Sequence, residues 1–193
     1  DFIILMASRL TKEKNIGMEI EAMKELSQGS RRRRGSPRAA KVKCQMLLLI
    51  VGDGPEQKNI QLLITNYQLQ NNIVIEPWTD DLVSYYKTAD LFLLTSNYEG
   101  YGRTVVEAMA SGLSVVMTDV GLAGELLIDD LDGRVVPVGD VKALVAAILE
   151  LQGNPAKGEE FSQNSLKLLE KWPTKKEYLE KYKNSLDFNK VLK

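Results

Sequence analysis

Residues 91–118 read LFLLTSNYEGYGRTVVEAMASGLSVVMT, and their pattern determines the class of fold. The apolar run at 91–95 predicts a strand that is buried on both faces. A glycine-containing loop and a helix expected over 104–111 follow it, and a second apolar strand is expected over 114–118. A strand, a helix and a strand in this order are the repeating unit of a parallel sheet.

The same alternation continues on both sides of this stretch. Further strands are expected at residues 2–6, 46–51, 73–75 and 134–138, and further helices at residues 14–27, 56–67, 81–88 and 141–151. The predicted fold is therefore an α/β domain with a Rossmann-like doubly wound parallel sheet and right-handed crossovers.

The strands stop before residue 153, so we divide the chain there. Residues 1–153 form the predicted domain, and residues 154–193, which are rich in Lys and Glu, form a predicted C-terminal helical segment. We expect this segment to pack back on the core through its large apolar side chains, which are Trp172, Tyr178, Tyr182 and Leu186. Because the chain starts with Asp1 and enters a strand at once, we expect it to be a piece of a longer protein.

The composition of the 193 residues is that of an ordinary globular domain, with 44% hydrophobic and 26% charged residues. The single cysteine, Cys44, excludes an internal disulfide framework, and the absence of histidine excludes histidine-dependent triads and histidine metal ligands. The longest apolar run, residues 46–51, is far shorter than the roughly 20 residues that a membrane helix needs. With no secretory signal at the start, a reducing, cytoplasmic setting is expected.

The net charge of −1 conceals one basic segment. Residues 31–43 contain seven Lys or Arg and no acid, so the remaining residues have 18 positive against 26 negative charges. This distribution argues against nucleic acid as a partner. We expect residues 29–41 to form an exposed loop, and two interpretations of Arg31–Arg34 stay open: a solvated loop, or a peripheral membrane contact with anionic lipid.

The segment between residues 96 and 112 has the features of a ligand site. In a parallel sheet, ligands bind at the carboxyl ends of the strands, which is where this loop is expected. Gly100 and Gly102 let the backbone approach a ligand closely, and the free N–H groups of the helix start suit a phosphate. Glu107 could accept hydrogen bonds from sugar hydroxyls, with Glu99 across the loop. The alternative is that Glu107 only interacts favourably with the helix dipole and that Glu99 is a solvated acid in the loop.

This stretch resembles the donor-binding half of a GT-B glycosyltransferase from the large retaining group called family 4, or glycosyl transferases group 1. Glu99 and Glu107 have the spacing of its E-x7-E signature. Other motifs agree with that family in order along residues 2–152. They are Ser8-Arg9-Leu10 with Lys14-Asn15, Gly52-Asp53-Gly54-Pro55, Thr88-Ala89-Asp90, and Thr118-Asp119-Val120-Gly121 with Glu125.

The resemblance implies a role for each matching residue. Arg9 and Lys14 are expected to bind the donor diphosphate and offset the charge that grows on it, and Glu99 to face the transferred sugar. Glu107 is expected to bind the ribose hydroxyls. The other donor-binding residues implied are Gly54, Trp78 against the base, and Gly100, Tyr101, Gly102, Arg103 and Thr104 around the sugar and phosphates. No cofactor and no metal are implied. Without the other motifs, Arg9 and Lys14 would suit purely structural roles.

Several positions depart from the family or allow a plainer interpretation. Pro77 stands where the family usually has glycine, and beside it Trp78 is either a stacking partner for the base or a partly buried anchor. Arg103 replaces a residue that is more often apolar, and it reaches either a phosphate, an acidic sugar or solvent. The segment 121–125 departs from the common Gly-Gly-x-Pro-Glu pattern. We interpret Asp130-Leu131-Asp132 as a turn before Gly133 rather than a metal-binding pair.

The resemblance implies the nucleotide-sugar-binding half of a retaining hexosyltransferase. A UDP-sugar is favoured as the donor because UDP donors are common in the resembled family. The acceptor hydroxyl, on a sugar, a lipid-linked molecule or a glycan, is expected to bind to an N-terminal domain absent from this chain, which alone would show little or no transfer. The alternatives are another GT-B-fold enzyme, such as a nucleotide-sugar epimerase or a glycan phosphorylase, and a non-catalytic nucleotide-sugar-binding or docking module.

Overall fold

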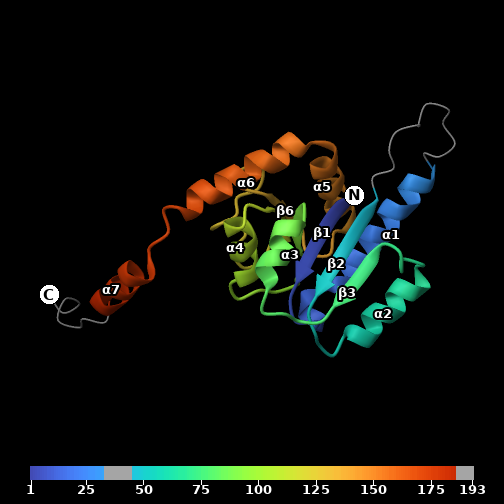
Figure 1. Cartoon of the computed structure of the whole chain (residues 1–193), viewed down its shortest axis with the longest axis horizontal. Helices are drawn as coiled ribbons and strands as arrows, with labels where there is room; N and C mark the ends of the chain where they lie inside the picture. The colour runs from blue at the N-terminus through green and yellow to red at the C-terminus, as the bar shows by residue number, and fades with distance from the viewer. Residues whose placement is uncertain (33–44, 186–193) are drawn as a thin grey trace.

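A computed structural model describes residues 1–32 and 45–185, and its centre is one six-stranded sheet in the order β3-β2-β1-β4-β5-β6 (Figure 1). The strands are β1 (Phe2–Ala7), β2 (Met46–Val51), β3 (Ile73–Glu76), β4 (Leu91–Leu94), β5 (Ser114–Thr118) and β6 (Arg134–Val136). Every neighbouring pair is parallel. The predicted doubly wound sheet is therefore confirmed. The strand order reverses between β1 and β4, and open sheets of this kind bind ligands at such a point.

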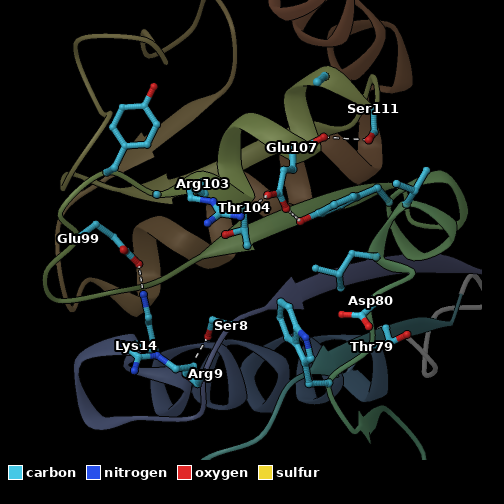
Figure 2. Close-up of a pocket in the computed structure, with 17 residues that line it drawn as sticks. Ser8, Arg9, Lys14, Thr79, Asp80, Glu99, Arg103, Thr104, Glu107 and Ser111 are labelled. Atoms are coloured by element: carbon cyan, nitrogen blue, oxygen red, sulfur yellow. Dashed lines mark hydrogen bonds and ion pairs between the residues drawn. The ribbon is translucent and has the colours of Figure 1, made fainter. Parts of the chain in front are cut away.

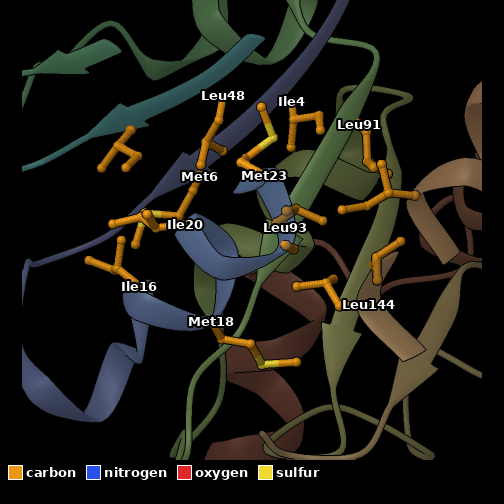
Figure 3. Packing of buried hydrophobic residues seen from close by; sticks show 14 of the residues in the cluster. Ile4, Met6, Ile16, Met18, Ile20, Met23, Leu48, Leu91, Leu93 and Leu144 are labelled. Atoms are coloured by element: carbon orange, nitrogen blue, oxygen red, sulfur yellow. The ribbon is translucent and has the colours of Figure 1, made fainter. Parts of the chain in front are cut away.

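Helices cover both faces of the sheet. One face packs against α1 (Ile16–Arg32), α2 (Gln57–Asn66) and α5 (Val141–Gly153), and the other against α3 (Leu82–Thr88) and α4 (Arg103–Ala110). Alternate residues of each strand enter opposite layers, so Ile4 belongs to the α1 layer and Leu5 to the α4 layer. Figure 3 shows the α1 layer, in which Ile16, Ile20 and Met23 of α1 lie against strand residues.

The first helix differs from the prediction at both ends. Lys12–Lys14 form a separate 3-10 helix, η1, which Asn15 ends in the left-handed region with φ 48°. α1 then starts at Ile16 and continues to Arg32. The exposed loop expected from residue 29 is therefore wrong for its first four residues. Residues 33–44 lie outside the described residues, and with them Arg33 and Arg34 of the basic segment.

The two C-terminal helices differ in how they pack. α6 (Pro155–Leu169) begins at the Asn154 cap and buries Phe161, Ser162 and Ser165 against the domain. α7 (Lys175–Ser185) has no buried residue and stands apart from the sheet in Figure 1. Trp172, Tyr178 and Tyr182 are each 40% or more exposed, so the packing that we expected of them is not found, and Leu186 lies outside the described residues. Between Lys175 and Lys183 only two tyrosines and one leucine offer apolar area, which is too little to hold the helix on the core.

Candidate nucleotide-sugar site

A cavity of about 840 Å³ opens at the carboxyl ends of β1, β3 and β4. This volume lies within the usual range for sites that enclose a small molecule or cofactor. The side chains in Figure 2 line it. Its lining includes nine of the eleven predicted site residues, which are Arg9, Lys14, Trp78, Glu99, Tyr101, Gly102, Arg103, Thr104 and Glu107. Residues that are up to 98 positions apart in sequence therefore meet at the reversal of the strand order.

Lys14 and Glu99 form an ion pair across this cavity. Lys14 Nζ lies 2.6 Å from Glu99 Oε1, and the hydroxyl of Ser96 donates to the same oxygen at 2.7 Å. The Lys14 and Glu99 side chains are only 16% and 10% exposed, so the pair is better shielded from water than a surface ion pair. Figure 2 shows Lys14 reaching from η1 toward Glu99. An anionic ligand at this place would meet a cation that is already positioned.

Backbone and side-chain contacts fix the turn that bears Lys14. Asn97 N donates to Glu13 O at 2.8 Å, and Asn15 Nδ2 donates to Asn97 Oδ1 at 3.1 Å. Thr95 Oγ1 lies 3.3 Å from Lys14 O. The left-handed Asn15 turns the chain sharply between η1 and α1, and this separates Lys14 from the helix on which we had placed it. The turn and the loop after β4 consequently form one unit.

The N-terminus of α4 faces the same cavity. Gly102 is the N-cap, with φ 90°, a conformation that glycine adopts without strain. Because Gly102 has no side chain, no side-chain cap covers the N–H groups of the first turn. Together with the helix dipole, those groups favour an anion such as a phosphate.

Glu107 lies on the cavity side of α4, one turn after Arg103. Glu107 Oε1 faces the Arg103 guanidinium at 3.7 Å, and Glu107 Oε2 accepts a hydrogen bond from the hydroxyl of Tyr86 at 3.0 Å. The Arg103 side chain is 85% exposed, so its ion pair contributes little and the guanidinium is free to move to a ligand. Glu107 itself is partly exposed, which leaves acceptor positions open toward the cavity.

Two of the predicted residues do not line the cavity, and Gly54 has a clear structural role. An added Cβ on Gly54 would lie 2.3 Å from Leu10 O, because the loop after β2 packs directly on the backbone after β1. Gly100 has open space around it. Trp78 lines the cavity half-exposed, and its backbone N–H donates to Asp53 Oδ2 at 2.9 Å. Trp78 thus has a face available to a ligand.

The chain matches the family model described as glycosyl transferases group 1 over residues 1–168. The chain belongs to this family. The sheet and its helices have the architecture of GT-B glycosyltransferases. Membership favours a glycosyltransferase over the epimerase, phosphorylase and docking-module alternatives.

The matches to known members of similar sequence span most of this chain but only a small part of each relative. The chain is 30% identical over 139 residues to the poly(glycerol-phosphate) alpha-glucosyltransferase of Bacillus subtilis strain 168, a match that spans 72% of this chain and 20% of that enzyme. It is 32% identical over 117 residues to the N-acetyl-alpha-D-glucosaminyl L-malate synthase of Bacillus anthracis, spanning 61% of this chain and 30% of that enzyme.

Solved structures of similar fold agree with this family. The pneumococcal O-GlcNAc transferase GtfA in complex with UDP and GlcNAc is 28% identical, with a TM-score of 0.75 over 95% of this chain and 35% of that one. Staphylococcus aureus TarM shares the fold, with a TM-score of 0.81 at 23% identity over 94% of this chain and 34% of that one. The chain thus spans between a fifth and about a third of the length of these relatives.

Three side chains of this group 1 glycosyltransferase domain were missed in the sequence. Tyr86 supports Glu107, and Ser96 supports Glu99. Glu19 is 0% exposed in α1, where its Oε1 lies 2.8 Å from Thr95 Oγ1. Tyr86 and Ser96 gave no signal, because a tyrosine among apolar residues and a serine in a loop are both ordinary. Glu19 did give one, since it falls between Ile16 and Met23 on the apolar face of its helix.

Neither a metal cluster nor a membrane-spanning helix is found within residues 1–32 and 45–185. No group of three or more His, Cys, Asp or Glu there could hold a metal ion. None of the helices in these ranges is long and apolar enough to cross a bilayer. Asp130 and Asp132 lie in a turn, as expected: Asp130 has φ 64° and pairs with Lys157 and Arg134, and Asp132 is buried.

Proposed function

We propose that this domain binds a nucleoside diphosphate sugar, with a UDP-sugar favoured, and serves as the donor half of a retaining, family 4 hexosyltransferase. One observation supports this most directly: a single cavity brings together a shielded and an exposed cation, an uncapped helix N-terminus and two carboxylates. Cations and N–H groups suit a diphosphate, whereas carboxylates suit sugar hydroxyls. UDP in the GtfA structure and in other similar structures supports the choice of base.

The ion pair between Lys14 and Glu99 suggests how the donor would bind. A diphosphate near Lys14 would compete with Glu99 for the ammonium group. Glu99 would then turn toward the hydroxyls of the sugar, while Arg9, Lys14 and the α4 N-terminus offset the charge on the departing diphosphate. This arrangement gives the leaving group positive partners from the protein itself. The proposed reaction therefore does not require a bound metal.

The acceptor site is proposed to lie outside this chain, because the relatives are three to five times longer than the matched part. In the whole enzyme the sugar would pass to an acceptor hydroxyl with its configuration retained, the departing phosphate helping to take the acceptor proton. The acceptors named for relatives, such as a poly(glycerol-phosphate), are of the hydroxyl-bearing kind that this reaction needs. The chain of 193 residues is expected to bind the donor nucleotide with little or no transfer.

Titration calorimetry with UDP, GDP and ADP tests the proposal. We expect saturable binding of UDP, and we expect Lys14→Ala to weaken it by about 10- to 100-fold, since a charge-assisted contact contributes roughly 1.5–3 kcal/mol. Glu107→Ala is expected to weaken it as well. EDTA should leave the affinity for UDP unchanged.

Lys12→Ala is the matched control, because Lys12 belongs to the same 3-10 turn, is exposed and does not line the cavity. It removes the same charge two residues away, and UDP affinity is expected to stay near that of the unchanged chain. Equal losses from Lys12→Ala and Lys14→Ala would mean that general charge, not a positioned ammonium group, attracts the nucleotide.

A further inference from the structure

The carboxylate of Glu107 accepts a hydrogen bond from the hydroxyl of a buried tyrosine. Tyr86 Oη donates to Glu107 Oε2 at 3.0 Å, and Tyr86 is only 2% exposed. Tyr86 belongs to α3 and Glu107 to α4, which cover the same face of the sheet. The contact therefore joins two helices at the point where both line the cavity.

Tyr86 is a rigid donor. Its ring packs edge-on against Phe92 of β4, with centroids 5.8 Å apart and an interplanar angle of 63°. Burial, together with the charge of Glu107, raises the pKa of Tyr86 well above its ordinary value, so the hydroxyl keeps its proton. Because Tyr86 keeps its proton, its hydroxyl is the donor and Glu107 Oε2 is the acceptor.

The other contact of this carboxylate is weaker. Arg103 faces Glu107 Oε1 at 3.7 Å from a side chain that is almost fully exposed, and such pairs seldom hold a geometry. Tyr86 is thus the contact that sets the plane of the carboxylate. A carboxylate held in this way leaves acceptor positions for two adjacent hydroxyl groups at once, whereas one that rotates freely loses orientational freedom when it binds both.

We propose that Tyr86 is the positioning residue for Glu107, and that it thereby makes the site select a nucleotide with a vicinal diol, a ribonucleotide, over its 2′-deoxy counterpart. This inference rests on the proposed function, in which Glu107 binds the ribose. Tyr86 is proposed to act only by orienting Glu107, without contacting the ligand itself.

Binding of UDP and 2′-deoxy-UDP to the unchanged chain, Tyr86→Phe and Glu107→Ala tests this role. The unchanged chain is expected to prefer UDP by about tenfold, the usual effect of one hydrogen bond to a charged group. Tyr86→Phe keeps the buried ring and its contact with Phe92 but removes the donor. It is expected to weaken UDP by about 5- to 10-fold and 2′-deoxy-UDP by less, so that the preference shrinks to about twofold.

Tyr85→Phe is the matched control, because it removes a hydroxyl from the neighbouring residue, and that hydroxyl makes no hydrogen bond to Glu107 within the described residues. It should leave the preference for UDP unchanged. The double variant Tyr86→Phe/Glu107→Ala should show the same preference as Glu107→Ala alone, because Tyr86 acts only through Glu107. Thermal melts of all variants separate loss of folding from loss of selectivity.

The outcomes distinguish a failure of the role of Tyr86 from a failure of the proposed nucleotide site. If Glu107→Ala abolishes the preference while Tyr86→Phe weakens both nucleotides equally, Tyr86 is merely structural and the inference is overturned. If Glu107→Ala leaves UDP affinity and the preference unchanged, or if the unchanged chain binds no UDP, the proposed nucleotide site itself is overturned and the role of Tyr86 with it.

Discussion

Replacing Glu19 with glutamine is expected to remove a pH dependence of several kcal/mol from the stability of this chain. Glu19 is fully buried, its Oε1 contacts Thr95 Oγ1, and its Oε2 has no hydrogen-bond partner among the described residues. Burial raises the pKa of Glu19 from 4.5 to about 8, against the opposing effect of the Thr95 hydroxyl. The neutral acid is therefore the form that the fold accommodates at neutral pH.

The raised pKa determines the sign of the effect. Below pH 4.5 Glu19 is protonated in both the folded and the unfolded chain, and its contribution to stability is fully present. Between pH 4.5 and about 8 the unfolded chain loses this proton while the folded chain keeps it, so the free energy of unfolding falls as the pH rises. At about 1.4 kcal/mol per pH unit, the loss amounts to roughly 5 kcal/mol by pH 8.

Urea denaturation of the unchanged chain and of Glu19→Gln at unit steps from pH 5 to pH 9 measures this. The glutamine amide has no proton to lose, so the difference between the two free energies should grow with pH up to about 8 and then level off. Glu21→Gln is the control, because Glu21 lies on the exposed side of the same helix. Its curve should run parallel to that of the unchanged chain. A Glu19→Gln curve that is also parallel would show that Glu19 is ionised in the folded state.

Gly54→Ala is expected to destabilise the fold by roughly 3 kcal/mol or more, because a methyl group has no room there. Its Cβ would lie 2.3 Å from Leu10 O and 2.7 Å from Leu10 C, which are backbone atoms of a fully buried residue. Two hydrogen bonds join the same segments: Leu10 N donates to Asp53 O at 2.9 Å, and Glu56 N donates to Leu10 O at 3.0 Å. Separating the segments would strain or break both.

Gly17→Ala is the control for this substitution. Gly17 lies in the first turn of α1, and an added Cβ would meet nothing within 4 Å beyond the adjoining backbone of its own helix, so alanine should raise stability by up to about 1 kcal/mol through helix propensity. Thermal or urea denaturation of the two variants compares them directly. A Gly54→Ala variant as stable as the unchanged chain would mean that the loops after β1 and β2 can separate at little cost.

Strand positions were predictable because the strands are short, mainly apolar runs ended by polar or glycine-containing loops, and β1, β4 and β5 are largely buried on both faces. β2 and β5 were predicted with their observed bounds, and the other strands to within two residues. The site after β4 was predictable for a similar reason: its glycines and Glu107 belong to one continuous segment. Local sequence contains the information for local structure.

The remaining features depend on contacts between distant segments. The separate turn of Lys14 depends on Asn15 adopting the left-handed conformation, which is difficult to predict from the sequence. The pairing of Lys14 with Glu99 joins residues 85 positions apart, and that of Tyr86 with Glu107 joins two helices. The polar end of α1, residues 27–32, has no apolar spacing from which a helix could be read. Only the packed molecule shows which side chains meet.

The place of β1 in the sheet has a consequence for biosynthesis. β1 precedes the other five strands of this sheet along the chain, yet it lies between β2 and β4, and its second edge is paired only when residues 91–94 have been made. Until then the nascent chain presents an unpaired, apolar strand edge of the kind that invites pairing with other chains. Truncated products that end before β4 are therefore expected to aggregate, whereas translation past β5 allows both edges and both faces of β1 to be covered.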